Sequence, residues 1–341
     1  MTNKPPYHTI ARLVILAPNW LGDAVMALPA IADVRRARPD CRVTIAARPS
    51  IAPLFRLLAE SGGPSDDVEV VTLERRRWSE LGAEVDVLRA GRFDAALLLP
   101  NSLRSALMVS RAGIAERWGY RSDCRGRLLT RAVQPPRVLH QVELYQRLVQ
   151  ALGFPNGPIE PTLAVPAAAR DAAEQLLAGV DRARPRVAIA PGAAYGGAKR
   201  WPPAFFAALA RSLAGDGIET IMVGSAADRR TADEVLQSNP HVHDLVGKTD
   251  LAALTGILAS CRTLVTNDSG AMHLAAAVGT PVTAVFGPTD ERATRPLGDR
   301  HAILTGPAWC RPCMLRECPL DHRCMRGIEV APVVAAARRT L

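Results

Sequence analysis

The chain has 341 residues, of which 48% are hydrophobic and 22% are charged. This length favours two domains of ordinary size, and the composition is typical of a soluble globular protein with ample core. No apolar run approaches the roughly 18 residues that a membrane span needs. The apolar core at residues 13–18 is too short for a signal peptide. We therefore expect a cytoplasmic protein, in which disulfides are rare.

The chain is basic, with 42 Lys and Arg against 33 Asp and Glu and a net charge of +9. Residues 1–160 hold 22 of the basic residues and 16 of the acidic ones. A basic first half favours an anionic partner, such as a phosphorylated substrate, a membrane surface or nucleic acid. An ordinary solvated surface explains the same charge equally well.

Short apolar runs alternate with helical stretches in the first half of the chain. Strands are predicted at residues 13–17, 43–47, 68–73 and 95–99, and helices at 23–36, 53–59, 79–90, 103–111 and 141–152. Apolar strands without strict alternation, separated by helices, indicate a parallel sheet covered on both faces.

The same pattern restarts after a Pro- and Gly-rich boundary at residues 153–168. Strands are predicted at residues 187–190, 220–223, 264–265 and 282–286, and helices at 203–214, 226–237, 251–259, 271–278 and 330–339. The sequence predicts an α/β protein with two doubly wound, Rossmann-like domains, residues 1–165 and 166–341, facing each other across a cleft at the carboxyl ends of their strands. The last helix could pack back on the first domain.

Residues 266–290, TNDSGAMHLAAAVGTPVTAVFGPTD, form a strand–turn–helix–strand pattern. Its turn, Asn267-Asp268-Ser269-Gly270, opens a helix, whose free N–H groups and dipole favour a phosphate. His273 in that helix is a packing residue or a ligand.

Residues 17–30, APNWLGDAVMALPA, place Asp23 at the start of a helix that follows the first strand. An Asp at this point is a good N-cap or first-turn residue. The functional alternative is a general base that takes a proton from a sugar hydroxyl.

Residues 191–202, PGAAYGGAKRWP, form a glycine-rich turn with Lys199 before Trp-Pro. The glycines let the backbone approach a phosphate, and Lys199 could neutralise charge on a leaving diphosphate. A surface loop with an ordinary Lys is the alternative, because no Walker motif is present.

Gly224 and Ser225, with Asp228 three residues on, form either a nucleotide contact or a tight turn with a helix cap.

Four of the seven cysteines, Cys310, Cys313, Cys318 and Cys324, fall in fifteen positions, with His322 among them. This density predicts either a structural zinc site or a thiol-rich loop without metal.

Together GDAVMALPA, AKRWP and TNDSGAMHLAAAVGTP resemble the ADP-heptose:lipopolysaccharide heptosyltransferases, glycosyltransferase family 9. The segment CRPCMLRECPLDHRCM is particularly similar to the type II members. The resemblance implies a GT-B fold and an inverting transfer of heptose that requires no metal or other cofactor. The implied donor is ADP-L-glycero-β-D-manno-heptose, bound by the C-terminal domain. The implied acceptor is the first heptose of the Kdo–lipid A inner core, bound by the N-terminal domain at the cytoplasmic face of the inner membrane.

The resemblance also implies roles for single residues. Asp23 matches the proposed base and Lys199 the essential Lys on the donor phosphates. Asp268 matches the residue that holds the heptose hydroxyls, and Ser269 and Gly270 lie at the diphosphate. The loop before Lys199 lacks a hydroxyl pair or acidic residue, which shifts the expected phosphate contacts to backbone N–H groups.

Other functions fit less well. A type I or III heptosyltransferase, or an enzyme for another nucleotide sugar, stays open because first-half loops choose the acceptor. A nicotinamide dehydrogenase is disfavoured because no GxGxxG follows the first strand. A non-catalytic nucleotide-binding module is a further alternative. Nucleic-acid binding is not expected, since no recognition motif accompanies the charge. Peripheral membrane binding could use Arg75-Arg76-Arg77 or the cluster Arg117, Arg121, Arg125 and Arg127.

Overall fold

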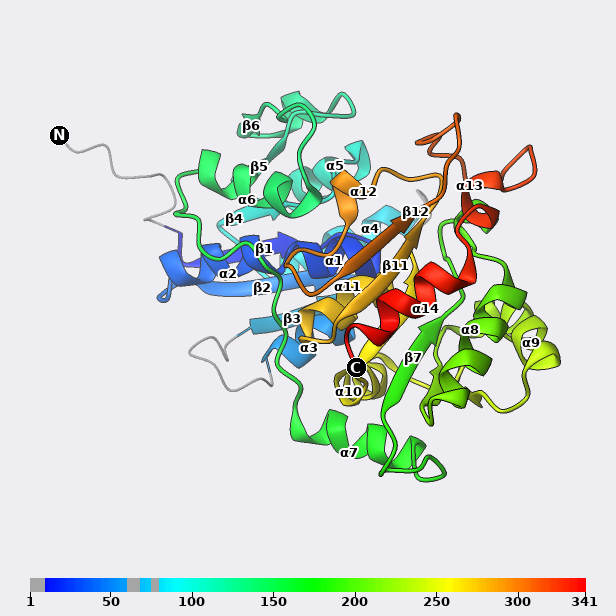
Figure 1. Ribbon diagram of the computed structural model, residues 1–341. Helices are drawn as coiled ribbons and strands as arrows, with labels where there is room; N and C mark the ends of the chain where they lie inside the picture. Colours follow the sequence, from blue (N-terminus) through cyan, green and yellow to red (C-terminus); the bar gives the residue numbers. More distant parts are fainter. Residues whose placement is uncertain (1–9, 60–67, 75–79) are drawn as a thin grey trace. The chain divides into compact units, whose positions relative to one another are not determined.

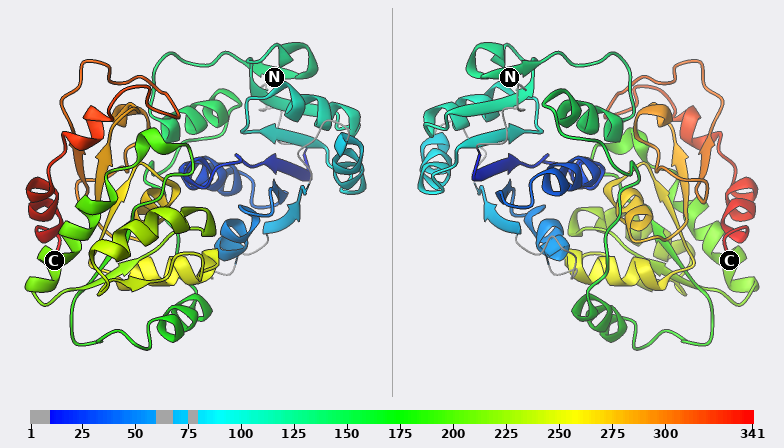
Figure 2. Two further views of the ribbon diagram at one scale, coloured as in Figure 1. Left: turned by 90° about the vertical axis from the view of Figure 1, so that its right-hand side faces the viewer. Right: turned by 90° about the vertical axis from the view of Figure 1, so that its left-hand side faces the viewer.

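The computed structural model describes residues 10–59, 68–74 and 80–341, and the chain forms two compact units, Met1–Leu163 and Ala164–Leu341 (Figure 1). Each unit contains one six-stranded sheet in which every strand pair is parallel. Parallel strands need helical crossovers, and these helices cover the sheets (Figure 2). The α/β class predicted from the sequence is therefore present in both units.

The first sheet has the strand order β3-β2-β1-β4-β5-β6. Its strands are β1 (Arg12–Leu16), β2 (Arg42–Ala47), β3 (Val68–Thr72), β4 (Ala95–Leu98), β5 (Glu116–Tyr120) and β6 (Arg131–Val133). The helices of this unit are α1 (Leu21–Met26), α2 (Leu28–Ala37), α3 (Ala52–Ala59), α4 (Leu81–Ala90), α5 (Leu103–Arg111), the 3-10 turn η3 (Arg125–Leu128) and α6 (Gln141–Ala151).

The second sheet has the order β12-β11-β10-β7-β8-β9. Strands β7 to β9 extend toward one edge of the sheet and β10 to β12 toward the other, so the strand order reverses between β7 and β10. Its strands are β7 (Arg186–Ala190), β8 (Glu219–Met222), β9 (His243–Asp244), β10 (Thr263–Asn267), β11 (Val282–Phe286) and β12 (Ala302–Thr305). The helical elements are α7 (Ala167–Leu176), η4 (Gly197–Lys199), α8 (Pro203–Gly215), η5 (Ala226–Asp228), α9 (Arg229–Ser238), α10 (Leu251–Ser260), α11 (Gly270–Ala277), α12 (Glu291–Thr294), α13 (Arg323–Arg326) and α14 (Val330–Arg338).

The helix expected over residues 23–36 is two helices, α1 and α2, which meet at Ala27. Pro29 lies in the first turn of α2, where a residue without an N–H is tolerated, whereas inside one long helix it would remove a hydrogen bond. Asp23 therefore belongs to a short helix of its own, directly after β1.

The core of the second unit surrounds Trp201, which is fully buried. Its indole N–H donates to the Ile328 carbonyl at 2.8 Å, and its ring meets Phe205 and Phe206 edge-on. Helix α14 packs beside α8 and on β10, β11 and β12. These contacts make the helix part of the second unit, and its expected packing on the first domain stays a prediction.

Helices α7 and α10 pack closely because α10 carries a glycine at the contact. A Cβ on Gly256 would lie 2.1 Å from the Ala169 carbonyl oxygen and 2.8 Å from the Ala173 Cβ. Backbone of another helix cannot move aside easily, so this glycine permits the approach of the two helices.

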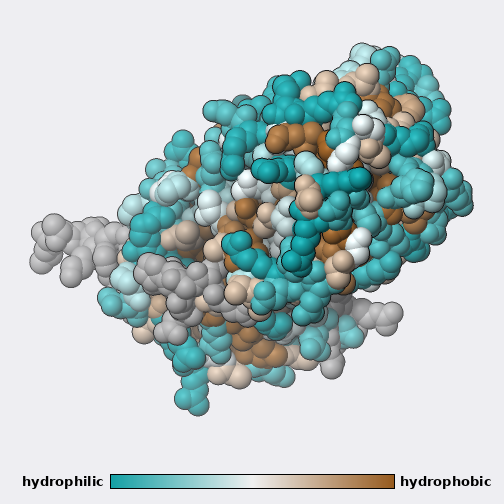
Figure 3. All heavy atoms as spheres, turned by 60° about the horizontal axis from the view of Figure 1, so that its bottom comes forward, coloured by the Kyte–Doolittle hydropathy of each residue, from teal (hydrophilic) through white to brown (hydrophobic). Residues whose placement is uncertain are grey.

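Among the described ranges, with their gaps at 60–67 and 75–79, the structure has no helix long and apolar enough to cross a membrane. On the face viewed in Figure 3, hydrophobic residues form separate patches among hydrophilic ones.

The substitution Gly256→Ala should lower the free energy of unfolding by about 1–3 kcal/mol, because the added methyl overpacks the α7–α10 contact. Gly215→Ala is the matched control, since a Cβ there meets nothing within 4 Å at the end of α8. Urea denaturation of both variants checks this. Equal stability of the two variants would contradict the assignment of a packing role to Gly256.

Candidate functional site in the second unit

The carboxyl ends of β7 and β10 are joined by one buried side chain. Asn267, at the end of β10, is 0% exposed. Its side-chain amide nitrogen donates to the carbonyls of Pro191 (2.8 Å) and Gly192 (3.2 Å), and its side-chain oxygen accepts from the backbone N–H of Trp201 at 3.0 Å. These contacts hold the two ends of the 191–201 loop, and the expected donor contact of Asn267 stays a prediction.

This loop delivers Lys199 to the residue that follows Asn267. Lys199 Nζ lies 2.6 Å from Asp268 Oδ2, which also accepts from the Thr289 hydroxyl at 2.7 Å. The Lys199 and Asp268 side chains are 12% and 7% exposed. The structure thus brings together two predicted site residues that are 69 positions apart, and it adds Thr289, which no sequence motif indicated.

The helix that follows Asp268 presents its N-terminus at the same strand end. Ser269 is the N-cap residue of α11, Gly270 begins the helix, and both are partly exposed. Ser269 Oγ lies 3.0 Å from Thr266 Oγ1 and makes no cap hydrogen bond. The first N–H groups of α11 carry the positive end of the helix dipole, which favours an anion. His273, one turn on, is buried within this helix.

Gly224 and Ser225 follow β8 and form a helix cap. The Ser225 N–H and hydroxyl both donate to Asp228 Oδ2, at 2.9 Å and 2.7 Å, in a capping box. A Cβ on Gly192 would lie 2.2 Å from the Asp228 carboxylate, so this cap also lies against the 191–201 loop. These contacts are those of a turn with a helix cap, and the expected nucleotide contact of Gly224 and Ser225 stays a prediction.

The glycine-rich turn offers fewer free N–H groups than the sequence suggested. Gly197 N–H donates to the Glu317 carboxylate at 2.9 Å, and Ala198 N–H donates to the Arg316 carbonyl at 2.9 Å. Both donors are engaged by the segment around residue 317. The N–H groups of Gly197 and Ala198 therefore already have partners within the chain, and the expected phosphate contacts of this turn stay a prediction.

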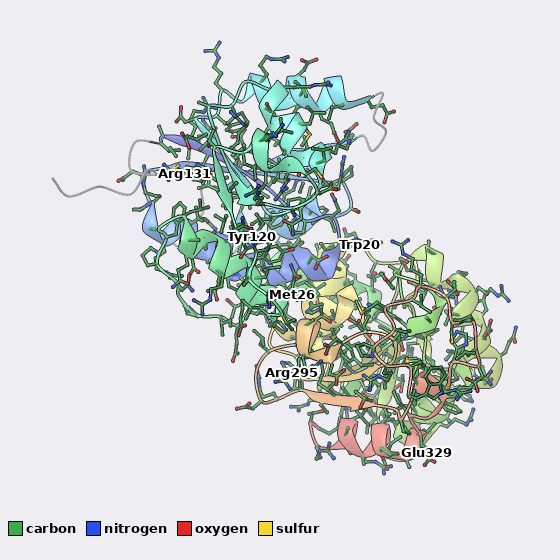
Figure 4. All side chains as sticks on the ribbon, turned by 90° about the horizontal axis from the view of Figure 1, so that it is seen from above. Trp20, Met26, Tyr120, Arg131, Arg295 and Glu329 are labelled. Carbon is green, nitrogen blue, oxygen red and sulfur yellow. The ribbon has the colours of Figure 1, made fainter. Side chains whose placement is uncertain are left out.

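Asp23 lies in the first unit, in the first turn of α1, and is half-buried. It is not the N-cap, because that position is Trp20, which is 50% exposed and is labelled in Figure 4. Burial raises the pKa of the Tyr145 hydroxyl on α6, and the negative charge of Asp23 raises it further. The role of Asp23 as a general base stays a prediction.

The arginine cluster of the first unit is only partly a surface feature. Arg125 is 0% exposed, and its guanidinium donates to the Tyr120 carbonyl and to Asn101 Oδ1. Burial lowers the pKa of Arg125 to about 10. Arg117 donates to the carbonyls of Leu128 and Ile114. Arg121 and Arg127 are exposed, whereas Arg75-Arg76-Arg77 lies outside the described residues.

The zinc site predicted at Cys310, Cys313, Cys318 and Cys324 has no ligand set. Within the part of the chain that the structure describes, no group of three or more His, Cys, Asp or Glu side chains is placed to hold a metal ion. Burial raises the pKa of the Cys324 thiol, and the other three cysteines raise it further. The structure therefore does not show the predicted zinc site.

Comparison with known families decides the class of the protein. The family model described as glycosyltransferase family 9 (heptosyltransferase) matches residues 85–323. The chain belongs to this family. It is therefore a glycosyltransferase, and the resemblance drawn from the three sequence motifs is confirmed.

Individual relatives agree with this assignment. Lipopolysaccharide heptosyltransferase 2 of Salmonella typhimurium is 30% identical over 314 residues, 86% of this chain and 87% of the relative. Lipooligosaccharide heptosyltransferase 2 of Haemophilus influenzae is 31% identical over 316 residues, 86% of this chain and 88% of the relative. The structure of E. coli ADP-heptose lps heptosyltransferase II is 27% identical, covers 96% of this chain and 98% of its own, and has a TM-score of 0.80. The expected GT-B fold is confirmed, whereas the cleft between the domains stays a prediction.

The substitution Lys199→Ala should lower the free energy of unfolding by about 3 kcal/mol, because it leaves Asp268 buried without its cation. The double variant Lys199→Ala/Asp268→Ala should lose less stability than the single one, a coupling that a double-mutant cycle measures.

Lys248→Ala is the matched control for Lys199. Lys248 lies 3.5 Å from Asp244 with a side chain that is 56% exposed, and such surface pairs contribute at most about 1 kcal/mol. If Lys199→Ala proved no less stable than Lys248→Ala in urea denaturation, the buried pair would be unimportant for stability.

Proposed function

We propose that this glycosyltransferase moves L-glycero-D-manno-heptose from ADP-heptose to the first heptose of the lipopolysaccharide inner core. The observation that carries the proposal is the pairing of Lys199 with Asp268 directly before the N-terminus of α11. This arrangement puts a cation, a carboxylate and a helix N-terminus at one strand end. A nucleotide sugar has matching groups, a diphosphate for the cation and the helix and hydroxyls for the carboxylate.

The relatives support the donor and the acceptor class. The E. coli structure is described as an ADP-heptose lps heptosyltransferase, and the Salmonella relative as a lipopolysaccharide heptosyltransferase 2. Most of the chain aligns with each, and similarity to the type II enzymes favours the first heptose of the core as the acceptor.

On the donor side, the second unit binds ADP-heptose. Lys199 turns from Asp268 toward the diphosphate, and Asp268, still held by Thr289, accepts hydrogen bonds from the heptose hydroxyls. Ser269 and Gly270 lie against the diphosphate at the start of α11. As the bond from the anomeric carbon to the phosphate oxygen breaks, negative charge grows on the leaving ADP, where Lys199 and the helix dipole stabilise it. These groups supply the positive charge, so we propose a transfer that does not use a metal.

On the acceptor side, Asp23 of the first unit takes the proton of the acceptor hydroxyl as its oxygen attacks the anomeric carbon. Attack from the face opposite ADP inverts the configuration at that carbon. One bond from carbon to oxygen forms, one breaks, and the proton ends on Asp23. Geometry at the moment of attack matters more than the resting pKa of the carboxylate.

An acceptor that is built on lipid A lies in a membrane, so we propose that the protein works as a peripheral protein at the cytoplasmic face of the inner membrane. The exposed Arg121 and Arg127 are the members of the arginine cluster that can meet anionic headgroups. Arg117 and Arg125, which bind backbone carbonyls, are not part of this contact.

The proposal predicts a definite product. Incubation with ADP-heptose and a series of core acceptors truncated before, at and after the first heptose should add one heptose only to the acceptor that ends in that heptose. Mass spectrometry of the products checks this. Transfer to the acceptor without heptose would assign the protein to type I instead, and no transfer to any acceptor would refute the proposed function.

The substitution Asp23→Asn should lower kcat by at least about 100-fold, because the amide cannot accept the proton. ADP affinity, measured by calorimetry, should stay unchanged, since the nucleotide binds the second unit. Asp40→Asn, an exposed aspartate of the first unit, is the control and should keep full activity. Turnover by Asp23→Asn within a few-fold of the unaltered protein would show that the base is another group.

A further inference from the structure

The segment that contains the four cysteines binds the loop that follows β11. Arg311 Nε donates to the Gly287 carbonyl at 2.6 Å, and its terminal nitrogen pairs with Glu291 at 2.8 Å. Met314 N–H donates to the Pro288 carbonyl at 2.9 Å. These bonds fix residues 311–314 beside Thr289, the residue that donates to Asp268.

The same segment then crosses to the glycine-rich turn before Lys199. Besides the bonds to Gly197 and Ala198 already described, the Tyr195 hydroxyl donates to the Met314 carbonyl at 2.8 Å. A Cβ on Gly196 would lie 2.2 Å from the Arg316 carbonyl oxygen, and one on Gly197 would lie 2.6 Å from Glu317 Oε2. A side chain at Gly196 would collide with the backbone of the segment, whereas one at Gly197 would force the Glu317 carboxylate to shift.

Residues 195–198 in turn determine where Lys199 lies. The Lys199 ammonium is 4.7 Å from the centre of the Tyr195 ring, and the Arg316 guanidinium is 5.2 Å from the same ring. Lys199 ends the 3-10 turn η4, which begins at Gly197. The backbone position of Lys199 thus depends on Gly197, two residues earlier, whose N–H donates a hydrogen bond to Glu317.

We infer that Glu317 is a positioning residue for the transfer reaction. By accepting a hydrogen bond from the Gly197 N–H, it fixes the turn from which Lys199 reaches the donor diphosphate. This inference rests on the proposed function, in which Lys199 meets the diphosphate. Glu317 touches neither donor nor acceptor and acts through the backbone of η4. Its bond is charge-assisted, and such bonds are stronger than those between neutral groups.

The exposure of Glu317 makes the inference testable without loss of the fold. Its side chain is exposed, so a substitution removes no core packing. Glu317→Ala removes the acceptor, whereas Glu317→Gln retains an oxygen in the same place. Glu329→Ala is the matched control, because Glu329, labelled in Figure 4, is an exposed glutamate of the same unit without a cap hydrogen bond.

The experiment compares steady-state kinetics of the full-length protein and these three variants with ADP-heptose and the accepted core substrate. Glu317→Ala should lower kcat by about tenfold through misplacement of Lys199, with the melting temperature and the acceptor KM unchanged. Glu317→Gln should recover most of the activity, and Glu329→Ala should match the unaltered protein. Full activity in Glu317→Ala, or equal losses in the Ala and Gln variants, would overturn the inference.

A second readout separates this inference from the proposed function. Hydrogen exchange of the peptide spanning residues 195–201, followed by mass spectrometry, should be faster in Glu317→Ala than in Glu317→Gln and Glu329→Ala. This measurement needs no substrate. Failure of the unaltered protein to transfer heptose would refute the proposed function alone, whereas unchanged exchange in Glu317→Ala would refute the role of Glu317 whatever the reaction.

Discussion

The candidate site of the second unit depends on the side-chain amide of Asn267. Asn267 is the last residue of a buried strand, and the three hydrogen bonds of its amide hold both ends of the loop that carries Lys199. A buried amide has to satisfy both its donors and its acceptor, so it fixes the loop in one path. Lys199 meets Asp268 because Asn267 and Asp268 are neighbours in the chain.

The buried parallel strands could be predicted from the sequence because burial on both faces produces continuous apolar runs, as in Ala95–Leu98 and Val282–Phe286. The strands β5 and β6 were missed, since Glu116–Tyr120 and Arg131–Val133 contain charged residues that interrupt the apolar runs. Of the two, β6 is the edge strand of its sheet, where charged residues are tolerated. Helix α7 was missed because its first residues were assigned to the boundary between the domains. The break at Ala27 depends on Pro29, which lies in the first turn of α2. From the sequence alone, a proline that begins a new helix cannot be told from one that kinks a continuous helix.

The residues of the site were predictable where a turn opens a helix, as at Asp268 to Gly270, and where Lys199 stands beside glycines. Their partners were not, because Thr289 and Glu317 lie on loops whose path depends on the whole fold. The density of cysteines in the sequence left a structural zinc site and a thiol-rich loop both open. In the structure, backbone hydrogen bonds and Arg311 hold this segment, and cysteine spacing does not indicate such contacts.

The ion pair of Lys199 with Asp268 has a consequence for selectivity. Before the donor arrives, the lysine charge is already balanced, so a simple anion such as inorganic phosphate has to compete with a buried carboxylate for it. A ligand that brings hydroxyl groups to Asp268 while it offers oxyanions to Lys199 compensates both partners at once. In the proposed function, the resting pair would therefore discriminate against bare nucleotides and phosphates in favour of a nucleotide that carries its sugar.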